Sequence, residues 1–279
     1  MMNNLTVIIV SFHSENKIFD CINSINKNVR IVVIENSNNE NLKKKLELTY
    51  SNVICILSKM NLGYGAGNNL GLSMVDTDYA LILNPDVVLN IDTLDNFNLN
   101  VRKYPDFGII APISKNEEYG NFNFLKDQTI KEVEYVKGFA MFFNMKKVKE
   151  INFFDENFFL YFEEIDLCKR LNKRGIKIFI DPSMVVNHFG GSSHDSKVNK
   201  QMELSRNWHW MWSTFYYHKK HFGYMRSILK IYPKLFSSLL KFLMYLFIFR
   251  LNKSAIYKYR FLGLINSILL KKSWYRPKF

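Results

Sequence analysis

Short apolar runs alternate with helix patterns along the first half of the chain, and this alternation most constrains the fold. The apolar runs occupy residues 5–10, 30–34, 53–57 and 79–83. Between them, helix patterns cover residues 17–25, 42–48 and 67–74. Buried strands separated by single helices are typical of a mostly parallel sheet with helices on both faces. We therefore predict an α/β fold.

Polar residues follow each of these predicted strands, at the point where the strand ends. They are Ser11, Glu35, Asn36, Asn61, Asn84 and Asp86. The carboxyl ends of parallel strands meet at one edge of a sheet, and ligands bind in the crevice beyond that edge. The sequence thus predicts a binding site there.

The second half of the chain predicts further strands and a helical end. Strands are expected at residues 107–112, 133–136, 139–143 and 176–180. A helix rich in tryptophan and tyrosine, residues 207–218, is expected to pack against the body, with a ligand platform as the alternative. We expect one main domain over residues 1–222 and a helical tail over residues 223–279.

Charge is distributed unevenly between these parts. The net charge is +13, yet the last acidic residue is Glu203, and 15 Lys and Arg follow it. The preceding part holds 23 basic and 25 acidic residues and is nearly neutral. The tail is apolar as well as basic, which favours an anionic membrane surface over nucleic acid as its partner.

The tail has the pattern of a helix that lies in a membrane interface. Lys230, Lys234 and Lys241 share one narrow helical face with two serines. The most apolar stretch, residues 235–249, is shorter than the roughly 20 residues that span a bilayer. An interfacial helix is therefore favoured, with residues 261–270 as a second membrane-touching segment. A helical cap on the body or a dimer interface is the alternative, and the oligomeric state is open.

The spacing of the cysteines and the N-terminal residues indicate the cellular location of the protein. The three cysteines are widely spaced, which indicates neither a disulfide framework nor a zinc cluster. Residues 1–12 read as a strand and not as a signal peptide. We expect a peripheral protein on the cytoplasmic face of the inner or plasma membrane.

An acidic cluster, Glu163, Glu164 and Asp166, directly follows the aromatic run of residues 158–162. Desolvating a carboxylate against an apolar wall is costly, so such a cluster indicates a general base, a metal ligand or a partner for sugar hydroxyls. Acidic residues in the first turn of a helix are the structural alternative.

Two further motifs carry weaker chemical signals. The glycine-rich run at residues 61–69 opens a helix and allows close approach of an anion, but it follows the third strand, which disfavours a Rossmann dehydrogenase or methyltransferase. Asp86, in Asn84-Pro85-Asp86, offers one carboxylate for Mg²⁺ or Mn²⁺, although this tripeptide also suits a turn.

The order of these motifs resembles the inverting glycosyltransferases of family 2, which have the Rossmann-like GT-A fold, and most of all their bacterial rhamnosyltransferase-like branch. The resemblance covers roughly residues 4–222. The motifs that carry it are residues 7–12, 32–37, 61–63, 83–86, 137–141, 154–156 and 161–167.

The resemblance implies a role for each matching residue. Glu164 is the catalytic base, with Glu163 and Asp166 as alternatives or as ligands of acceptor hydroxyls. Asp86 and His188 hold a divalent metal, Mg²⁺ or Mn²⁺. The donor site consists of Ser11, Glu35, Asn36, Asn61, Gly63, Asn68, Asn84, Asp86 and Gly138.

The implied activity is transfer of a sugar from a nucleoside diphosphate donor. Thymidine diphosphate rhamnose is the first expectation and a uridine diphosphate hexose the second. The expected acceptor is a lipid-linked saccharide or a growing cell-surface polysaccharide. Two alternatives stay open: a non-catalytic, membrane-bound nucleotide-sugar-binding module, and a sugar nucleotidyltransferase. The latter needs a basic, glycine-rich loop after the first strand, which residues 11–15 do not provide.

Overall fold

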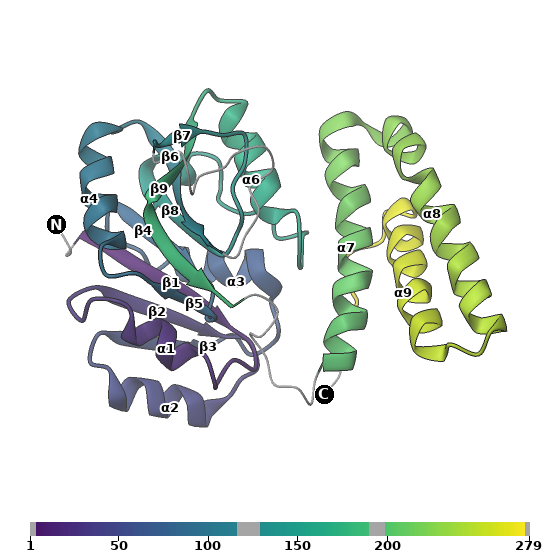
Figure 1. Cartoon of the computed structure of the whole chain (residues 1–279), viewed down its shortest axis with the longest axis horizontal. Helices are drawn as coiled ribbons and strands as arrows, with labels where there is room; N and C mark the ends of the chain where they lie inside the picture. Colours follow the sequence, from purple (N-terminus) through teal and green to yellow (C-terminus); the bar gives the residue numbers. More distant parts are fainter. Residues whose placement is uncertain (1–3, 116–128, 190–198, 277–279) are drawn as a thin grey trace. The chain divides into compact units, whose positions relative to one another are not determined.

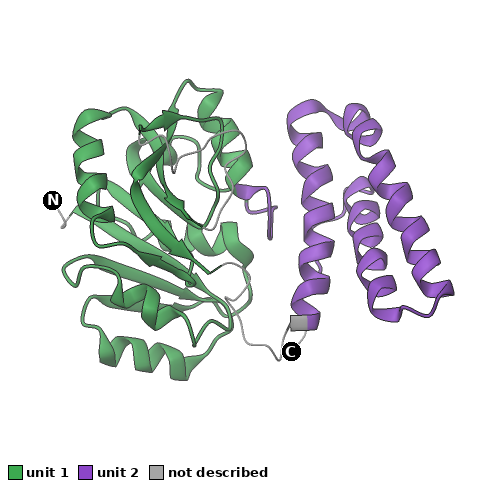
Figure 2. Ribbon diagram, viewed as in Figure 1, with its two compact units in different colours: residues 1–155, 164–195 green, residues 156–163, 196–279 purple. Residues whose placement is uncertain are grey.

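The chain forms two compact units, which are described separately. The computed structural model describes residues 4–115, 129–189 and 199–276. The first unit comprises residues 1–155 and 164–195, and the second comprises residues 156–163 and 196–279 (Figure 2). The aromatic helix thus groups with the tail helices, whereas the sequence suggested a boundary at residue 222. That functional boundary stays a prediction.

A mixed β-sheet forms the centre of the first unit. In the part of the chain that the structure describes, its strands are β1 (Leu5–Ser11), β2 (Arg30–Glu35), β3 (Val53–Leu57), β4 (Tyr79–Leu83), β5 (Val87–Leu89), β6 (Phe107–Ser114), β7 (Lys131–Glu132), β8 (Ala140–Asn144) and β9 (Lys177–His188). Their order is β3-β2-β1-β4-β8-β6-β9-β5, and β7 pairs with β9. Strands β1 to β4 are parallel, and β8 runs antiparallel to β4 and β6.

The strand order reverses direction at β1. Chain connections lead outward from β1 through β2 to β3, and then return to place β4 on the other side of β1. Such a reversal opens a crevice beyond the carboxyl ends of the two central strands, where ligands of open α/β sheets bind. The predicted polar strand ends Ser11 and Asn84 border this crevice.

Helices cover both faces of the sheet (Figure 1). They are α1 (Ile18–Asn23), α2 (Glu40–Thr49), α3 (Gly63–Leu72), α4 (Thr93–Lys103), α5 (Met145–Lys149) and α6 (Glu163–Asn172). Side chains alternate along β1, so Val7 and Ile9 join the core cluster with α1, α2 and α4, while Ile8 joins the cluster with α3, α5 and α6. The predicted α/β class with a GT-A-like layered sheet is confirmed.

Two predicted elements differ from the structure. Residues 133–136 do not form a strand. Strand β7 ends at Glu132, and the Val136 side chain packs in the core cluster that contains Ile8. Helix α3 begins at Gly63 and not at residue 67, because the Asn61 side chain accepts a hydrogen bond from the Gly63 N–H at 3.0 Å and so supports an earlier first turn.

The second unit is a helical layer of α7 (Asn199–Phe222), α8 (Tyr224–Phe247) and α9 (Leu251–Ile268). Its small core joins Met211 and Phe215 of α7 to Ile231 of α8 and Leu264 of α9. Helix α8 continues through Pro233. Within the described residues, every helix is too short or too polar to cross a bilayer.

Candidate active site

The ends of β1 and β2 bring three predicted donor-site residues together. Ser11 pairs with Glu35 in the parallel register, and the Asn36 N–H donates to the Ser11 carbonyl oxygen at 2.8 Å. All three side chains are buried. Buried polar atoms are costly when they have no hydrogen-bond partner, so any unsatisfied atoms of these side chains are candidates for contacts with a ligand.

Glu35 has one satisfied and one unsatisfied oxygen. Its Oε1 atom accepts hydrogen bonds from the Ser37 N–H, at 2.6 Å, and from the Ser37 hydroxyl. Its Oε2 atom has no hydrogen-bond partner among the described residues, and the same holds for Ser11 Oγ and Asn36 Oδ1. Burial raises the pKa of Glu35, and the bonds from Ser37 oppose that rise. The corner therefore presents three free polar atoms.

The glycine-rich start of α3 packs closely against this corner. The Asn36 side chain donates to the Gly63 carbonyl oxygen at 3.1 Å, and a Cβ on Gly67 would lie 3.0 Å from a Val10 methyl group. Asn68 is buried and donates to the Tyr64 carbonyl oxygen at 3.0 Å. The glycines thus allow α3 to approach β1, as the run at residues 61–69 suggested.

Asp86 and His188 come together although they are far apart in the sequence. Strand β5 pairs with β9 so that Val87 lies opposite His188, which places His188 Nε2 3.8 Å from Asp86 Oδ1. The His188 ring stacks on Phe139 with centroids 4.8 Å apart, and the Asn84 N–H donates to the Phe139 carbonyl oxygen at 2.9 Å. Two sequence-predicted metal ligands are therefore neighbours.

This pair fits a cation shared with a phosphorylated ligand. Asp86 is buried, and it provides a carboxylate beside an imidazole. Within the described ranges no group of three or more His, Cys, Asp or Glu side chains is arranged to hold a metal. Mg²⁺ is commonly held by one or two protein carboxylates, with waters and substrate phosphates completing its shell. The donor set suits that arrangement.

Gly138 links Tyr64 to Glu164. The Tyr64 hydroxyl donates to the Gly138 carbonyl oxygen, and a Cβ on Gly138 would lie 3.7 Å from the Glu164 Cβ. Sequence reasoning singled out Gly138 and Glu164 but missed Tyr64. The only signal was an aromatic residue between glycines, whose role depends on a loop that is distant in the sequence.

The three acidic residues of the cluster have different surroundings. Asp166 is fully buried and accepts from Arg170 Nε at 2.7 Å, and Arg170 also donates to the carbonyl oxygens of Ile151 and Phe153. Arg170 thus ties α6 to the preceding loop, and Asp166 holds the Arg170 guanidinium in place. Glu163 is buried, while Glu164 is partly buried.

The pKa of Glu164 is raised toward neutral pH. Burial raises the pKa of Glu164 to about 7, against the opposing effect of its own N–H and that of Ile165. A base with a pKa near the working pH combines a large deprotonated fraction with useful proton affinity.

The backbone before the acidic cluster is held in an unusual conformation. Tyr161 and Phe162 have φ angles of 69° and 71°, a region that costs bulky residues about 1–3 kcal/mol each. Within the second unit, Tyr161 and Phe162 contact Trp210, and the Ser213 hydroxyl donates to the Leu160 carbonyl oxygen at 2.9 Å. No pattern in the sequence predicts these φ angles.

Comparison with known proteins identifies the family. Residues 6–168 match the family Glycosyl transferase family 2. The chain belongs to this family. The match spans the crevice at β1 and β4, the Asp86 carboxylate and the acidic cluster, so the predicted family membership is confirmed.

Two curated relatives are similar to this glycosyltransferase at low identity. The low-salt glycan biosynthesis hexosyltransferase Agl10 of Haloferax volcanii is 26% identical over 201 residues, covering 64% of the chain and 64% of the relative. The chain thus matches less than two thirds of that protein's length. Rhamnosyltransferase WbbL of Escherichia coli is 25% identical over 249 residues, covering 76% of the chain and 91% of the relative.

A solved structure supports the fold of the glycosyltransferase. The mannosyltransferase PcManGT of Pyrobaculum calidifontis, solved with GDP-Man and Mn²⁺, superposes with a TM-score of 0.62 at 12% identity. The superposition covers 96% of the chain and 88% of that protein. At this identity the likeness concerns the fold alone.

Proposed function

We propose that this family 2 glycosyltransferase is an inverting enzyme that moves a sugar from a nucleoside diphosphate donor to a saccharide on a lipid carrier or to a growing cell-surface polysaccharide. The observation that carries the proposal is the placement of Glu164, with a pKa of about 7, against the Gly138 loop. This loop continues into Phe139, which packs on His188 beside Asp86.

Glu164 removes the proton from the acceptor hydroxyl as that oxygen attacks the donor sugar. Glu163 is assigned to an acceptor hydroxyl, and Asp166 to holding α6 through Arg170. Inversion in one displacement needs a base on the face opposite the leaving diphosphate and needs no covalent intermediate.

The donor binds across the crevice. Ser11, Glu35 and Asn36 offer polar atoms to the nucleotide, and the start of α3, with Asn61, Gly63 and Asn68, closes around it. Asn84 and Asp86 face the diphosphate, and Asp86 and His188 hold Mg²⁺ or Mn²⁺. When bound, the cation neutralises charge that develops on the leaving diphosphate.

The donor sugar is proposed from the relatives. A curated relative named as a rhamnosyltransferase favours thymidine diphosphate rhamnose, and the relative named as a hexosyltransferase keeps a uridine diphosphate hexose as the second choice.

Helix α8 provides the proposed membrane contact. Its exposed side chains form one apolar stripe along the helix: Met225, Leu229, Tyr232, Phe236, Leu240, Leu243 and Phe247. Its buried positions are Ser227, Ile231 and Ser238, so the stripe lies on another side of the helix from the packed residues. No acidic residue occurs after Glu203, so this part of the chain has a net positive charge. That charge complements anionic lipid headgroups.

A donor panel tests the proposal. Full-length protein is assayed for donor hydrolysis and binding across nucleotide sugars, with and without Mn²⁺. We expect metal-dependent selection of one donor. Absence of binding to every donor would instead favour the non-catalytic module.

A further inference from the structure

The second unit contains a pocket that the donor site does not use. It measures about 410 Å³, and all of its lining residues belong to the helical unit: Tyr161, Glu203, Arg206, Asn207, Trp210 and Arg260. Its walls combine aromatic, cationic and hydrogen-bonding groups.

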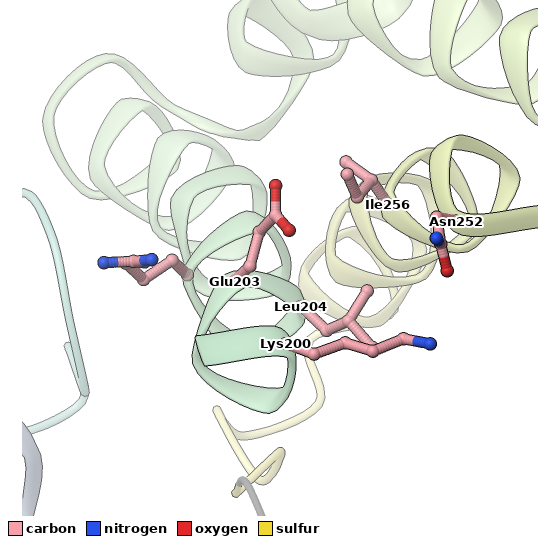
Figure 3. Close-up of a pocket in the computed structure, with 6 residues that line it drawn as sticks. Lys200, Glu203, Leu204, Asn252 and Ile256 are labelled. Carbon is pink, nitrogen blue, oxygen red and sulfur yellow. The ribbon is translucent and has the colours of Figure 1, made fainter. Parts of the chain in front are cut away.

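A neighbouring pocket of about 380 Å³ shares Glu203 and Arg206 with the first. Figure 3 shows Lys200, Glu203 and Leu204 on α7, with Asn252 and Ile256 on α9. Because two residues line both pockets, they form one continuous depression, which we call the α7–α9 groove.

One end of the groove is aromatic. Trp210 is 45% exposed, and the Tyr161 ring meets it edge-on with centroids 5.2 Å apart. An exposed indole with polar neighbours offers an apolar face to the C–H face of a sugar ring, while nearby polar groups bind the hydroxyls. Asn207 and Glu203 lie next to Trp210 in the same pocket.

The groove also has an excess of positive charge. Lys200, Arg206 and Arg260 oppose the single carboxylate of Glu203. Among the described residues, Arg206 and Glu203 form no ion pair with each other or with another side chain. The guanidinium charge is therefore available for a ligand.

The Arg260 guanidinium is held in place by two contacts. Its Nε atom donates to Asn207 Oδ1 at 2.6 Å, and its Cζ atom lies 5.3 Å from the Tyr257 ring centroid. A planar guanidinium fixed in this way matches the oxygen atoms of a phosphate group. The two arginines thus favour a phosphate over a neutral hydroxyl.

We propose that the α7–α9 groove binds a saccharide that carries a phosphate or diphosphate group, with the sugar ring on Trp210 and the phosphate at Arg206 and Arg260. The inference rests on the proposed function, in which the acceptor is a saccharide on a diphosphate carrier. Tyr161 of the groove precedes Glu164 by three residues in the chain.

Calorimetric titration of the full-length protein tests the groove, with glucose 1-phosphate, methyl glucoside and inorganic phosphate as probes. We expect glucose 1-phosphate to bind at least about tenfold more tightly than either simpler probe, because only it engages both ends. Arg206→Gln and Arg260→Gln should each weaken it at least about tenfold. Trp210→Ala should weaken both sugar probes and leave inorganic phosphate unchanged.

Arg226→Gln is the matched control, since it removes one exposed cationic side chain from α8 outside the groove. Arg206→Lys guards against misfolding, because it keeps the charge and should bind more tightly than Arg206→Gln. Wild-type affinity for glucose 1-phosphate in both glutamine variants would overturn the inference. Equal affinity for inorganic phosphate and glucose 1-phosphate would overturn it too, since the groove would then bind an anion only.

Donor turnover by the wild-type protein is measured in parallel and separates the two proposals. Turnover with unaltered probe binding in the glutamine variants refutes the groove and leaves the proposed function standing. Arginine-dependent probe binding without turnover of any donor refutes the catalytic proposal and supports the groove as a binding site.

Discussion

His188 Nε2 lies 3.8 Å from Asp86 Oδ1, and the pairing of β5 with β9 fixes this distance. The position of one residue in the sequence does not indicate the other, because the two lie far apart in the chain. Their proximity depends on the antiparallel edge of the sheet, where Val87 lies opposite His188.

Loss of the Asp86 carboxylate should cost more turnover than loss of the His188 imidazole. Asp86→Ala should lower donor turnover by about 10²–10³-fold, because the charge on the leaving diphosphate loses its stabilisation. His188→Gln should have a smaller effect and raise the Mn²⁺ concentration needed for half-maximal turnover. Mn²⁺ titrations of donor hydrolysis measure both effects. Full turnover by Asp86→Ala at limiting Mn²⁺ would contradict the assignment.

Glu164→Gln should reduce transfer by about 10²–10⁴-fold, the usual contribution of a general base, while the protein stays folded. Product formation with a saccharide acceptor measures the loss, and thermal unfolding checks the fold. Asp166→Asn is an informative comparison: it removes the charge that faces Arg170 and should mainly lower stability. Near-normal transfer by Glu164→Gln would move the base to Glu163 or Asp166.

The pH dependence follows from the raised pKa of Glu164. Transfer should increase as pH rises through about 7, because the base must lose its proton. Stability should change in the opposite direction. Between pH 4.5 and about 7 the folded state keeps a proton that the unfolded state has released, so this group's contribution is lost as pH rises.

Denaturant unfolding of wild type and Glu164→Gln at several pH values isolates that contribution. The free energy of unfolding of Glu164→Gln, measured relative to wild type, should increase as pH rises from 4.5 to 8. A pH-independent difference between the two proteins would show that Glu164 titrates normally.

Two glycine substitutions should separate site geometry from packing. An alanine Cβ at position 138 would lie 3.2 Å from the Tyr64 hydroxyl and 3.7 Å from the Glu164 Cβ. Gly138→Ala should therefore lower kcat/KM by about tenfold or more with little loss of stability. At Gly71 the new Cβ would lie 2.5 Å from an Ile8 methyl group, so Gly71→Ala should destabilise the fold by about 1–3 kcal/mol. Steady-state kinetics and thermal unfolding of both variants test the contrast.

Membrane association should depend on the exposed stripe of α8. The triple variant Leu229→Gln, Phe236→Gln and Leu243→Gln should lower partitioning into anionic vesicles by at least about 100-fold, because each side chain contributes about 1.5 kcal/mol when buried. Vesicle flotation measures the partition. The matched control changes three exposed apolar residues of the first unit to Gln: Leu48, Ile91 and Leu99. Equal flotation of the two triple variants would refute the stripe.

Local patterns predicted the parallel half of the sheet well, because β1 to β4 are short, apolar and separated by amphipathic helices. They also predicted the polar strand ends, since Ser11, Glu35 and Asp86 follow those runs directly. They failed at residues 133–136. There Val133 and Val136 pack in the hydrophobic core, and the residues that pair with β9 are Lys131 and Glu132.

The parts of the site that sequence reasoning missed depend on long-range contacts. The Tyr64 hydroxyl meets Gly138, and Trp210 packs against Tyr161. In both pairs the residues come from separate elements, and neither spacing nor composition indicates the partner. The differing environments of Glu163, Glu164 and Asp166 likewise arise from tertiary burial and from Arg170.

The peptide bond between Glu163 and Glu164 joins the two compact units, since residues 156–163 group with the helices and residue 164 groups with the sheet. The strained residues Tyr161 and Phe162 are secured to α7 just before this junction. Glu164, the proposed base, is thus bonded directly to a residue of the helical unit. A substitution that releases Tyr161 or Phe162 from Trp210 would therefore act within three residues of the proposed base.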